Sequence, residues 1–314
     1  MSVTNFPNGI SSFGVPLYGM SGMPIPSHLG KVFFVHSGNG AVVNDGLATD
    51  KALASIDSAV GKCSAGAGDV IMVLAGHTES VTAAGGIDLD VAGISVIGQG
   101  SGNNRPTVTF TTINTADIDI DAANVTLSNI RFVTDVDSLA APIDVNAAGF
   151  TMTHCDFYGN GGAAETNLIT VLTDAAAKRM KIQNCSFNYD AALDGTNITT
   201  TSTACIQLVG ADHAEILDNY ISGDFTTSAI NGITTASKDI KILRNAIYND
   251  ATENIAGVID LVAACTGIIA FNYGFMGYAT GLATVIDPAS CGMVQNYFSN
   301  VVTETGGLVG TAST

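Results

Sequence analysis

Apolar and polar residues alternate in short runs along most of the chain, and these runs recur as copies of one segment. Residues 122–132, with the sequence AANVTLSNIRF, return in similar form at 147–157, 177–187, 211–221, 237–247 and 265–275, with a shortened copy at 292–298. The last positions of successive copies lie 23 to 34 residues apart. A repeat of this length is typical of a supersecondary unit that stacks on its neighbours.

A second short apolar strand precedes most copies and often begins with Ile-Asp, as at residues 87, 118, 143 and 259. Alternation places Ile87 and Leu89 on one face of this strand and Asp88 on the other. Two or three short strands per coil predict an all-β fold, a single-stranded parallel β-helix. It is expected to be right-handed, because parallel crossovers almost always are. A leucine-rich-repeat solenoid is the alternative, but no copy carries the asparagine–leucine signature of that repeat.

Equivalent side chains are expected to stack from coil to coil. An inward aromatic column is predicted from Phe132, Phe157, Phe187, Phe275 and Phe298. Cys155 and Cys185 share the slot two residues earlier, which favours buried free thiols over a disulfide. His154 shares a slot with Asn129, Asn184 and Asn272, which indicates a hydrogen-bonding residue at a turn.

Three regions are expected along the chain: an extended arm at 1–29, a strand, turn and capping helix at 30–66, and the parallel β-helix at 67–314. The arm holds four of the seven prolines together with many apolar residues. Its proposed partner-binding anchors are Phe6, Phe13, Val15, Leu17 and Tyr18. Lying along the chain's own solenoid is the alternative for the arm. Thr49 is expected to cap an amphipathic helix from Asp50 to about Cys63, which would cover the open end of the β-helix.

The charge of the chain limits its partners. The sequence has 28 acidic and 11 basic residues, a formal net charge of −17. Nucleic acid would be repelled, so a nucleic-acid partner is not expected. No apolar run approaches the roughly 18 residues that a membrane span requires, and no membrane partner or cofactor is expected.

Asp88, Asp119 and Asp144 are predicted to form a column that points outward from successive coils, with Thr170 and Gln207 continuing the row. Three interpretations stay open for this column. It is a solvated or subunit-facing surface, a calcium site built from carboxylate oxygens, or a carboxylate pair for glycan cleavage. The surface is the preferred interpretation, with calcium a weak candidate.

Features that carry catalysis are scarce, so no catalytic residue is assigned and the chain is not expected to be an enzyme. It has no Trp and eight Tyr, which argues against extensive platforms for sugar rings. Candidate Lys and Arg bases do not lie on the strand that carries the aspartates. The five histidines show no metal-binding spacing.

The run KVFFVHSGNGAVVNDGLATDKALASIDSAVGKC, at residues 31–63, resembles the opening of pectin-lyase-like β-helix proteins. With the stretches GDVIMVLAGHTESV and AGISVIGQG, and the start NFPNGISSFGVP, it is similar to β-helix structural proteins of tailed bacteriophages. The resemblance covers most of residues 1–132. It implies a right-handed β-helix and a place in a phage particle, and it transfers no catalytic residue.

The resulting expectation is a phage capsid decoration or cement protein, assembled in the host cytoplasm and located on the capsid exterior. Its expected partners are the major capsid protein, bound through the arm, and other copies of the chain in a homotrimer. The alternative is a tailspike-like or fibre-like protein that binds or depolymerises bacterial surface polysaccharide.

Overall fold

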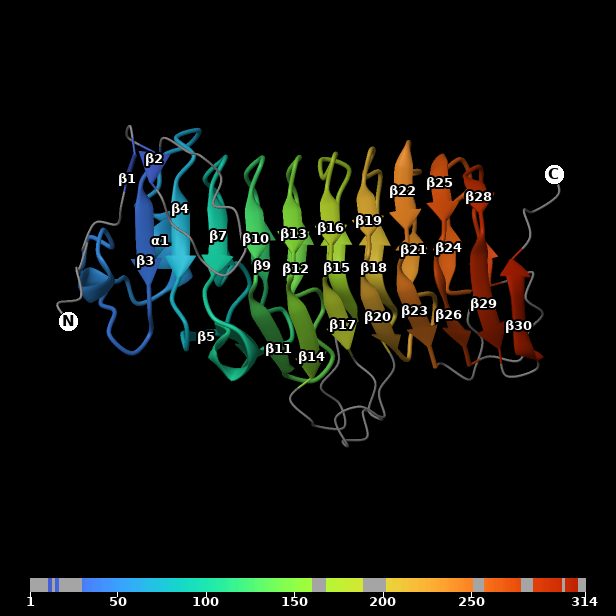
Figure 1. The fold of residues 1–314 in the computed structure, drawn as a ribbon, viewed down its shortest axis with the longest axis horizontal. Coiled ribbons are helices and arrows are strands. Elements are labelled where there is room, and N and C mark those ends of the chain that lie inside the picture. The colour runs from blue at the N-terminus through green and yellow to red at the C-terminus, as the bar shows by residue number, and fades with distance from the viewer. Residues whose placement is uncertain are drawn as a thin grey trace.

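The computed structural model describes residues 11–12, 15–16, 30–159, 168–188, 202–250, 257–277, 285–300 and 303–309. The chain winds through three sheets in turn, so that each coil adds one strand to each sheet (Figure 1). Among the described residues, two strand pairs are antiparallel: β1–β2 (Ser11–Ser12 and Val15–Pro16) and β29–β30 (Asn296–Asn300 and Thr303–Val309). The other strand pairs named here are parallel. The predicted parallel β-solenoid is therefore confirmed.

Sheet 1 contains ten strands: β3 (Val32–Val35), β4 (Val70–Val73), β7 (Ser95–Gly98), β10 (Thr126–Ser128), β13 (Thr151–Thr153), β16 (Lys181–Gln183), β19 (Glu215–Leu217), β22 (Ile240–Leu243), β25 (Gly267–Ala270) and β28 (Gly292–Val294).

Sheet 2 contains ten strands: β5 (Thr78–Val81), β8 (Thr107–Thr111), β11 (Arg131–Asp135), β14 (Asp156–Gly159), β17 (Ser186–Asn188), β20 (Tyr220–Gly223), β23 (Ala246–Asn249), β26 (Tyr273–Met276), β29 (Asn296–Asn300) and β30 (Thr303–Val309).

Sheet 3 contains eight strands: β6 (Ile87–Asp88), β9 (Ile118–Ile120), β12 (Ile143–Val145), β15 (Ile169–Thr173), β18 (Ala204–Leu208), β21 (Ile230–Gly232), β24 (Ile259–Leu261) and β27 (Ile286–Asp287).

The helical content of the described residues is small and differs from the predicted helix. A 3-10 turn, η1 (Thr49–Lys51), comes first, and η2 (Gly102–Asn104) lies in a later loop. The only α-helix among the described residues, α1 (Ile56–Val60), is capped by Ser55 and not by Thr49. Leu53 bridges to Val35 in extended conformation, and this pairing separates η1 from α1. No helix in the described part of the chain is long and apolar enough to cross a membrane.

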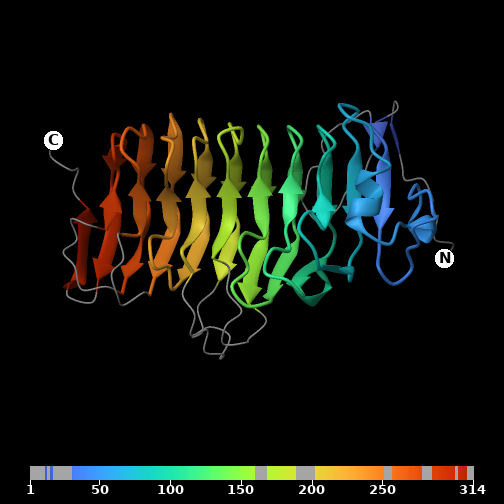
Figure 2. The same ribbon diagram turned by 180° about the vertical axis from the view of Figure 1, so that it is seen from behind.

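Helix α1 packs against β3, β4 and β6 at one end of the shaft, which Figure 2 shows from behind. Glu79 of β5 fixes the start of the helix, because its carboxylate accepts the Ile56 N–H at 2.9 Å. The same carboxylate lies 3.0 Å from Nε2 of the buried His77, whose Nδ1 accepts the Ser37 N–H. The helix thus covers the first coils, as its predicted capping role requires, over a shorter length.

Stacked side chains fill the space between the three sheets. Phe132, Phe157 and Phe187 are buried and lie in register, with ring centroids 4.7 and 4.9 Å apart. Phe298 is buried too. Phe275 was predicted to join this column, and that prediction is wrong, because Gly274 pairs with both Ile247 and Phe298. A Cβ at Gly274 would overlap the Ile247 carbonyl, and Phe275 is left half-exposed on the outer face.

A ladder of buried asparagines lines the corner between sheets 1 and 2 in the later coils. Its members are Asn219, Asn245, Asn272 and Asn296. Each Oδ1 accepts the backbone N–H of the residue one coil earlier, and each Nδ2 donates to a backbone carbonyl of sheet 1. Cys185 fills the same slot one coil earlier, and its N–H donates to Asn219 Oδ1 at 2.9 Å.

The structure corrects the slot predicted for Asn272. The turn position of Asn129, His154 and Asn184 has positive φ, near 55°, and in the later coil Phe271 takes it with φ of 59°. Asn272 is the next residue and points inward. Cys155 and Cys185 are buried and free, as predicted.

Candidate functional site: an acidic face on sheet 3

The acidic column consists of Asp88, Asp119 and Asp144, which occupy equivalent positions on β6, β9 and β12. Asp88 pairs with Asp119 in register, and Asp119 pairs with Asp144. Their neighbours Ile87, Leu89, Ile118 and Ile120 are buried, so the carboxylates lie on the outer face of sheet 3. The sequence prediction of this column is confirmed.

Further carboxylates surround the column, and their charges act on it. Burial, first, and then the charges of Asp117, Asp121, Asp144 and Asp88 together raise the pKa of Asp119 to about 6. The raised pKa means that the ionised form of Asp119 is disfavoured, because it is partly buried and lies beside other negative charges. At neutral pH the ionised column is electrostatically strained in the isolated chain.

The other two members of the column are perturbed in the same direction. Burial raises the pKa of Asp88, with contributions from Asp90, Asp121 and Asp57, the last a residue of α1. Burial also raises the pKa of Asp144, an effect that a hydrogen bond from Asn146 partly offsets. One carboxylate oxygen of Asp88, Oδ1, is buried without a hydrogen-bond partner in the described part of the chain.

The described residues provide no cation to neutralise the column. The ion pairs between described side chains involve other carboxylates, such as Asp156, Asp212, Glu215 and Asp218. Among these residues, no three or more His, Cys, Asp or Glu side chains are grouped closely enough to hold a metal ion. Calcium binding by Asp88, Asp119 and Asp144 stays a prediction.

The row continues differently from the sequence prediction. Leu172, and not Thr170, pairs with Asp144, because the register of β15 is shifted by two residues and Val171 lies opposite Ile143. Thr170 is buried. Gln207 continues the row as predicted, followed by Asn231, and then by Asp260 and Asp287 in register. Burial and the neighbouring Asp287 raise the pKa of Asp260. The acidic face is therefore interrupted by neutral residues in the middle of the shaft.

The predicted arm anchors cannot be placed on this surface. Phe6, Phe13, Leu17 and Tyr18 lie outside the described residues. Of Val15 the structure gives only the backbone, which pairs with Ser12 in β1–β2. The anchoring role of these five residues stays a prediction.

A group of aromatic side chains that was not predicted lies on the outer face of sheet 2, here called the aromatic row: Tyr220, Tyr248, Tyr273, Phe275 and Tyr297. Tyr273 and Tyr297 are paired in register and are 51% and 48% exposed. The rings of Tyr220 and Tyr248 are 5.7 Å apart. A signal was present, because the dipeptide Asn-Tyr recurs at 219–220, 272–273 and 296–297, with Asn inward and Tyr outward.

Comparison with known proteins supports the fold. No family model and no curated protein matches the chain. A solved rhamnogalacturonan lyase matches with a TM-score of 0.55 at 11% identity, over 79% of this chain and 69% of the lyase.

Two phage proteins match with lower TM-scores. The ORF18 protein of Geobacillus virus E2 has a TM-score of 0.40 at 15% identity, over 78% of this chain and 57% of its own. The tailspike of E. coli bacteriophage HK620 has 0.38 at 10% identity, over 74% and 56%. At these identities the likeness is one of fold alone, a parallel β-solenoid.

Proposed function

We propose that the chain is a non-enzymatic structural protein of a phage particle, and that it decorates the outer face of the capsid. The observation that carries this proposal is the acidic column on a rigid three-sheet shaft. Its carboxylates are half-buried, crowded and without cations. A partner that brings Lys or Arg to this face would stabilise the ionised carboxylates and gain binding free energy.

The proposed partner is the major capsid protein, with neighbouring copies of the chain completing a homotrimer. The resemblance of residues 1–132 to phage structural proteins supports this choice. The arm, with Phe6, Phe13, Val15, Leu17 and Tyr18, would supply apolar anchors, and the acidic face would orient the shaft. Deleting residues 2–28 is expected to abolish capsid binding and leave the β-sheet circular dichroism unchanged. Retained binding would refute the anchoring role of the arm.

The test of the acidic face counts copies bound to capsids that lack the protein. Wild type is expected to saturate at a fixed, symmetry-compatible number per particle. A variant with Asn at 88, 119 and 144 should bind at least about tenfold more weakly. The matched control places Asn at 45, 50 and 137, which removes the same charge from exposed positions elsewhere. If both variants lose capsid affinity equally, the effect is one of net charge and not of the acidic column. If the wild-type protein does not bind capsids, the decoration role is refuted.

The aromatic row favours a second candidate function, the binding of bacterial surface polysaccharide. Ser222 and Ala246, whose positions in sheet 2 face outward beside these rings, carry no charge. Sugar rings present C–H faces that pack on aromatic rings, and phenol hydroxyls offer hydrogen bonds.

The chain has no Trp, and four of its eight tyrosines belong to the aromatic row, so tyrosine fluorescence is sensitive to binding at this surface. Adding purified host polysaccharide should change that fluorescence saturably, and Tyr273→Ala should weaken binding. Tyr158→Ala, at a tyrosine that lies under Arg131, is the control. Release of oligosaccharide would add a depolymerase activity, and an unchanged signal would exclude binding at the aromatic row.

A further inference from the structure

The basic residues of this acidic protein are concentrated on one stretch of the shaft. Six of the eleven Lys and Arg lie between residues 178 and 244. They occupy sheet 1 and its adjoining turns: Lys178, Arg179, Lys181, Lys238, Lys241 and Arg244. Four carboxylates lie among them: Asp212, Glu215, Asp218 and Asp239. These six cations and four carboxylates give sheet 1 and its adjoining turns a local excess of positive charge within a chain of formal charge −17.

Most of these charged side chains form ion pairs with side chains of the neighbouring coil. The coil of β19 contributes Asp212, Glu215 and Asp218, and the coils on either side contribute the cations. Glu215 Oε1 accepts from Lys241 Nζ at 2.7 Å, and its Oε2 lies 3.8 Å from Lys181 Nζ. The hydrogen bond from Lys241 lowers the pKa of Glu215, so Glu215 remains charged.

Arg244 is held in the same way. Its Nε and Nη2 donate to the two carboxylate oxygens of Asp218, at 2.6 and 2.8 Å. Lys178 Nζ lies 3.4 Å from Asp212 Oδ2. Planar bidentate pairing of this kind leaves few donors of the Arg244 guanidinium free.

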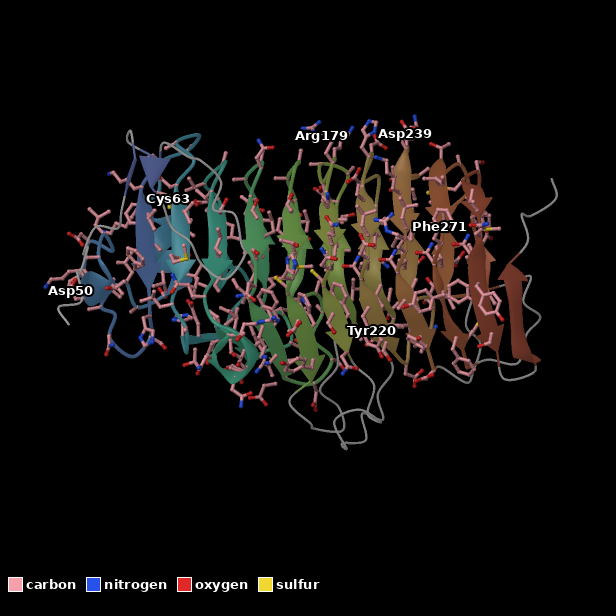
Figure 3. All side chains as sticks on the ribbon, in the orientation of Figure 1. Asp50, Cys63, Arg179, Tyr220, Asp239 and Phe271 are labelled. Carbon is pink, nitrogen blue, oxygen red and sulfur yellow. The ribbon has the colours of Figure 1, made fainter. Side chains whose placement is uncertain are left out.

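Arg179 differs from Lys178, Lys181, Lys241 and Arg244. No hydrogen bond or ion pair within the described part of the chain holds its guanidinium. The residue is exposed at the edge of the shaft, where Figure 3 labels it, and it has a φ of 57°. An unpaired guanidinium offers a planar set of donors that matches an oxyanion.

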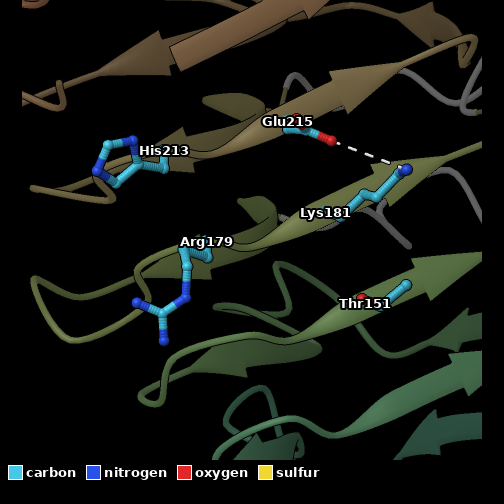
Figure 4. A pocket seen from close by; sticks show the side chains of 5 residues that line it. All are labelled: Thr151, Arg179, Lys181, His213 and Glu215. Atoms are coloured by element: carbon cyan, nitrogen blue, oxygen red, sulfur yellow. Dashed lines mark ion pairs between the residues drawn. The ribbon is translucent and has the colours of Figure 1, made fainter. Parts of the chain in front are cut away.

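Arg179 lines an open pocket of about 520 Å³ with Thr151, Lys181, His213 and Glu215. Figure 4 shows Arg179 and His213 on one side and the Lys181–Glu215 pair on the other. His213 is tied only loosely, with Nδ1 3.8 Å from Asp239 Oδ2. The volume lies in the range of small-molecule sites.

We propose that this pocket binds a small oxyanion, a phosphate or a carboxylate. Arg179 is the principal donor, with support from His213, Lys181 and the Thr151 hydroxyl. The Lys241 bond to Glu215 offsets the one carboxylate that lines the pocket, which leaves Arg179 and Lys181 to attract an anion. The proposal is independent of capsid binding, because it concerns sheet 1 and not the acidic face of sheet 3.

The test is an NMR titration of the full chain at low ionic strength, with inorganic phosphate in one arm and sodium acetate in the other. The chain has five histidines, which keeps the imidazole spectrum simple. The His213 resonances are expected to shift saturably, while those of His154, a turn residue two coils earlier, stay in place. Tighter binding in one arm identifies the tetrahedral or the planar anion.

Two matched variants separate a local site from a general positive field. Arg179→Asn and Arg244→Asn each remove one guanidinium from a residue with φ near 57°, a conformation that Asn tolerates. Arg179→Asn is expected to weaken phosphate binding at least about tenfold, and Arg244→Asn less than about twofold. Equal weakening, or a His213 shift that does not saturate, would overturn the proposal and leave only diffuse attraction.

Discussion

Phe157 shows how single residues stabilise the stack. Its ring lies between those of Phe132 and Phe187 in the next coils on either side. Truncation would remove both contacts and leave a cavity that neighbouring coils, held by their own hydrogen bonds, cannot close. Phe157→Ala is therefore expected to lower the free energy of unfolding by about 3–5 kcal/mol in urea denaturation. Phe275→Ala, at the half-exposed position, should cost less than about 1.5 kcal/mol, and equal losses would contradict the assignment.

The sequence predicted the buried position of Phe157 correctly and that of Phe275 wrongly, and the reason lies in the spacing from the preceding turn. Phe132, Phe157 and Phe187 follow a turn residue at a constant distance, so spacing alone placed them correctly. Asn occupies the turn slot in early coils and the inward slot in later ones. Alignment on Asn272 therefore displaced Phe275 by one position. A shift of one residue moves a side chain to the other face of the strand.

The asparagine ladder acts at the scale of the element, because it joins consecutive turns. Asn245 Oδ1 accepts from the Asn219 N–H, and its Nδ2 donates to the carbonyl of Ile216 and to Asn272 Oδ1. Removing this amide would leave buried backbone groups without partners. Such groups cost about 1–3 kcal/mol each.

We expect Asn245→Ala to lower the free energy of unfolding by about 2–4 kcal/mol, measured by chemical denaturation. Asn146→Ala provides the matched control, because that amide is half-exposed and donates to Asp121 at 3.1 Å. The control should change stability by no more than about 0.5 kcal/mol. A ladder variant as stable as the control would show that the buried amides are dispensable.

The capping helix illustrates the limit of prediction for elements. Its apolar stripe correctly indicated a helix at this end, but Leu53 belongs to a pairing with β3 that no local pattern reveals. The start of α1 is set by the Ser55 side chain together with Glu79, which is 23 residues away from Ile56 in the chain. Contacts of such separation override local helix propensity.

For the whole molecule, the acidic face makes stability depend on pH. The pKa of Asp119 in the folded chain, about 6, lies above its usual value of 3.8. A raised carboxyl pKa means that the folded state binds the proton more tightly than the unfolded state. Stability contributed by this group is therefore present below pH 3.8 and is lost as the pH rises through 6.

Asp119→Asn is accordingly expected to raise the free energy of unfolding at pH 7.5 by about 1 kcal/mol, after allowance for solvent screening. Urea titrations at pH 4.5 and 7.5 measure the effect, which should shrink at the lower pH. Asp212→Asn is the control of opposite sign, because a hydrogen bond from the Lys238 N–H lowers the pKa of Asp212. Stabilisation by both substitutions would point to net charge and not to crowding in the column.

The candidate sites were accessible from the sequence to different degrees. The acidic column followed from Ile-Asp pairs that begin equivalent strands. The pocket beside Arg179 did not, because it depends on which cations are already held by carboxylates of the next coil. That distinction exists only once the register of β16, β19 and β22 is known.

The alternating charges of the middle coils make the order of the coils part of the fold. Backbone pairing and the asparagine ladder would accept one later coil in place of another. The charged side chains would not accept such an exchange. Excising the coil of β19 would remove Glu215 and place Lys181 directly beside Lys241. Like charges on facing strands are destabilising. The repeats are therefore not interchangeable modules, and recombination or design that shortens the shaft at this point would have to rewrite the flanking lysines.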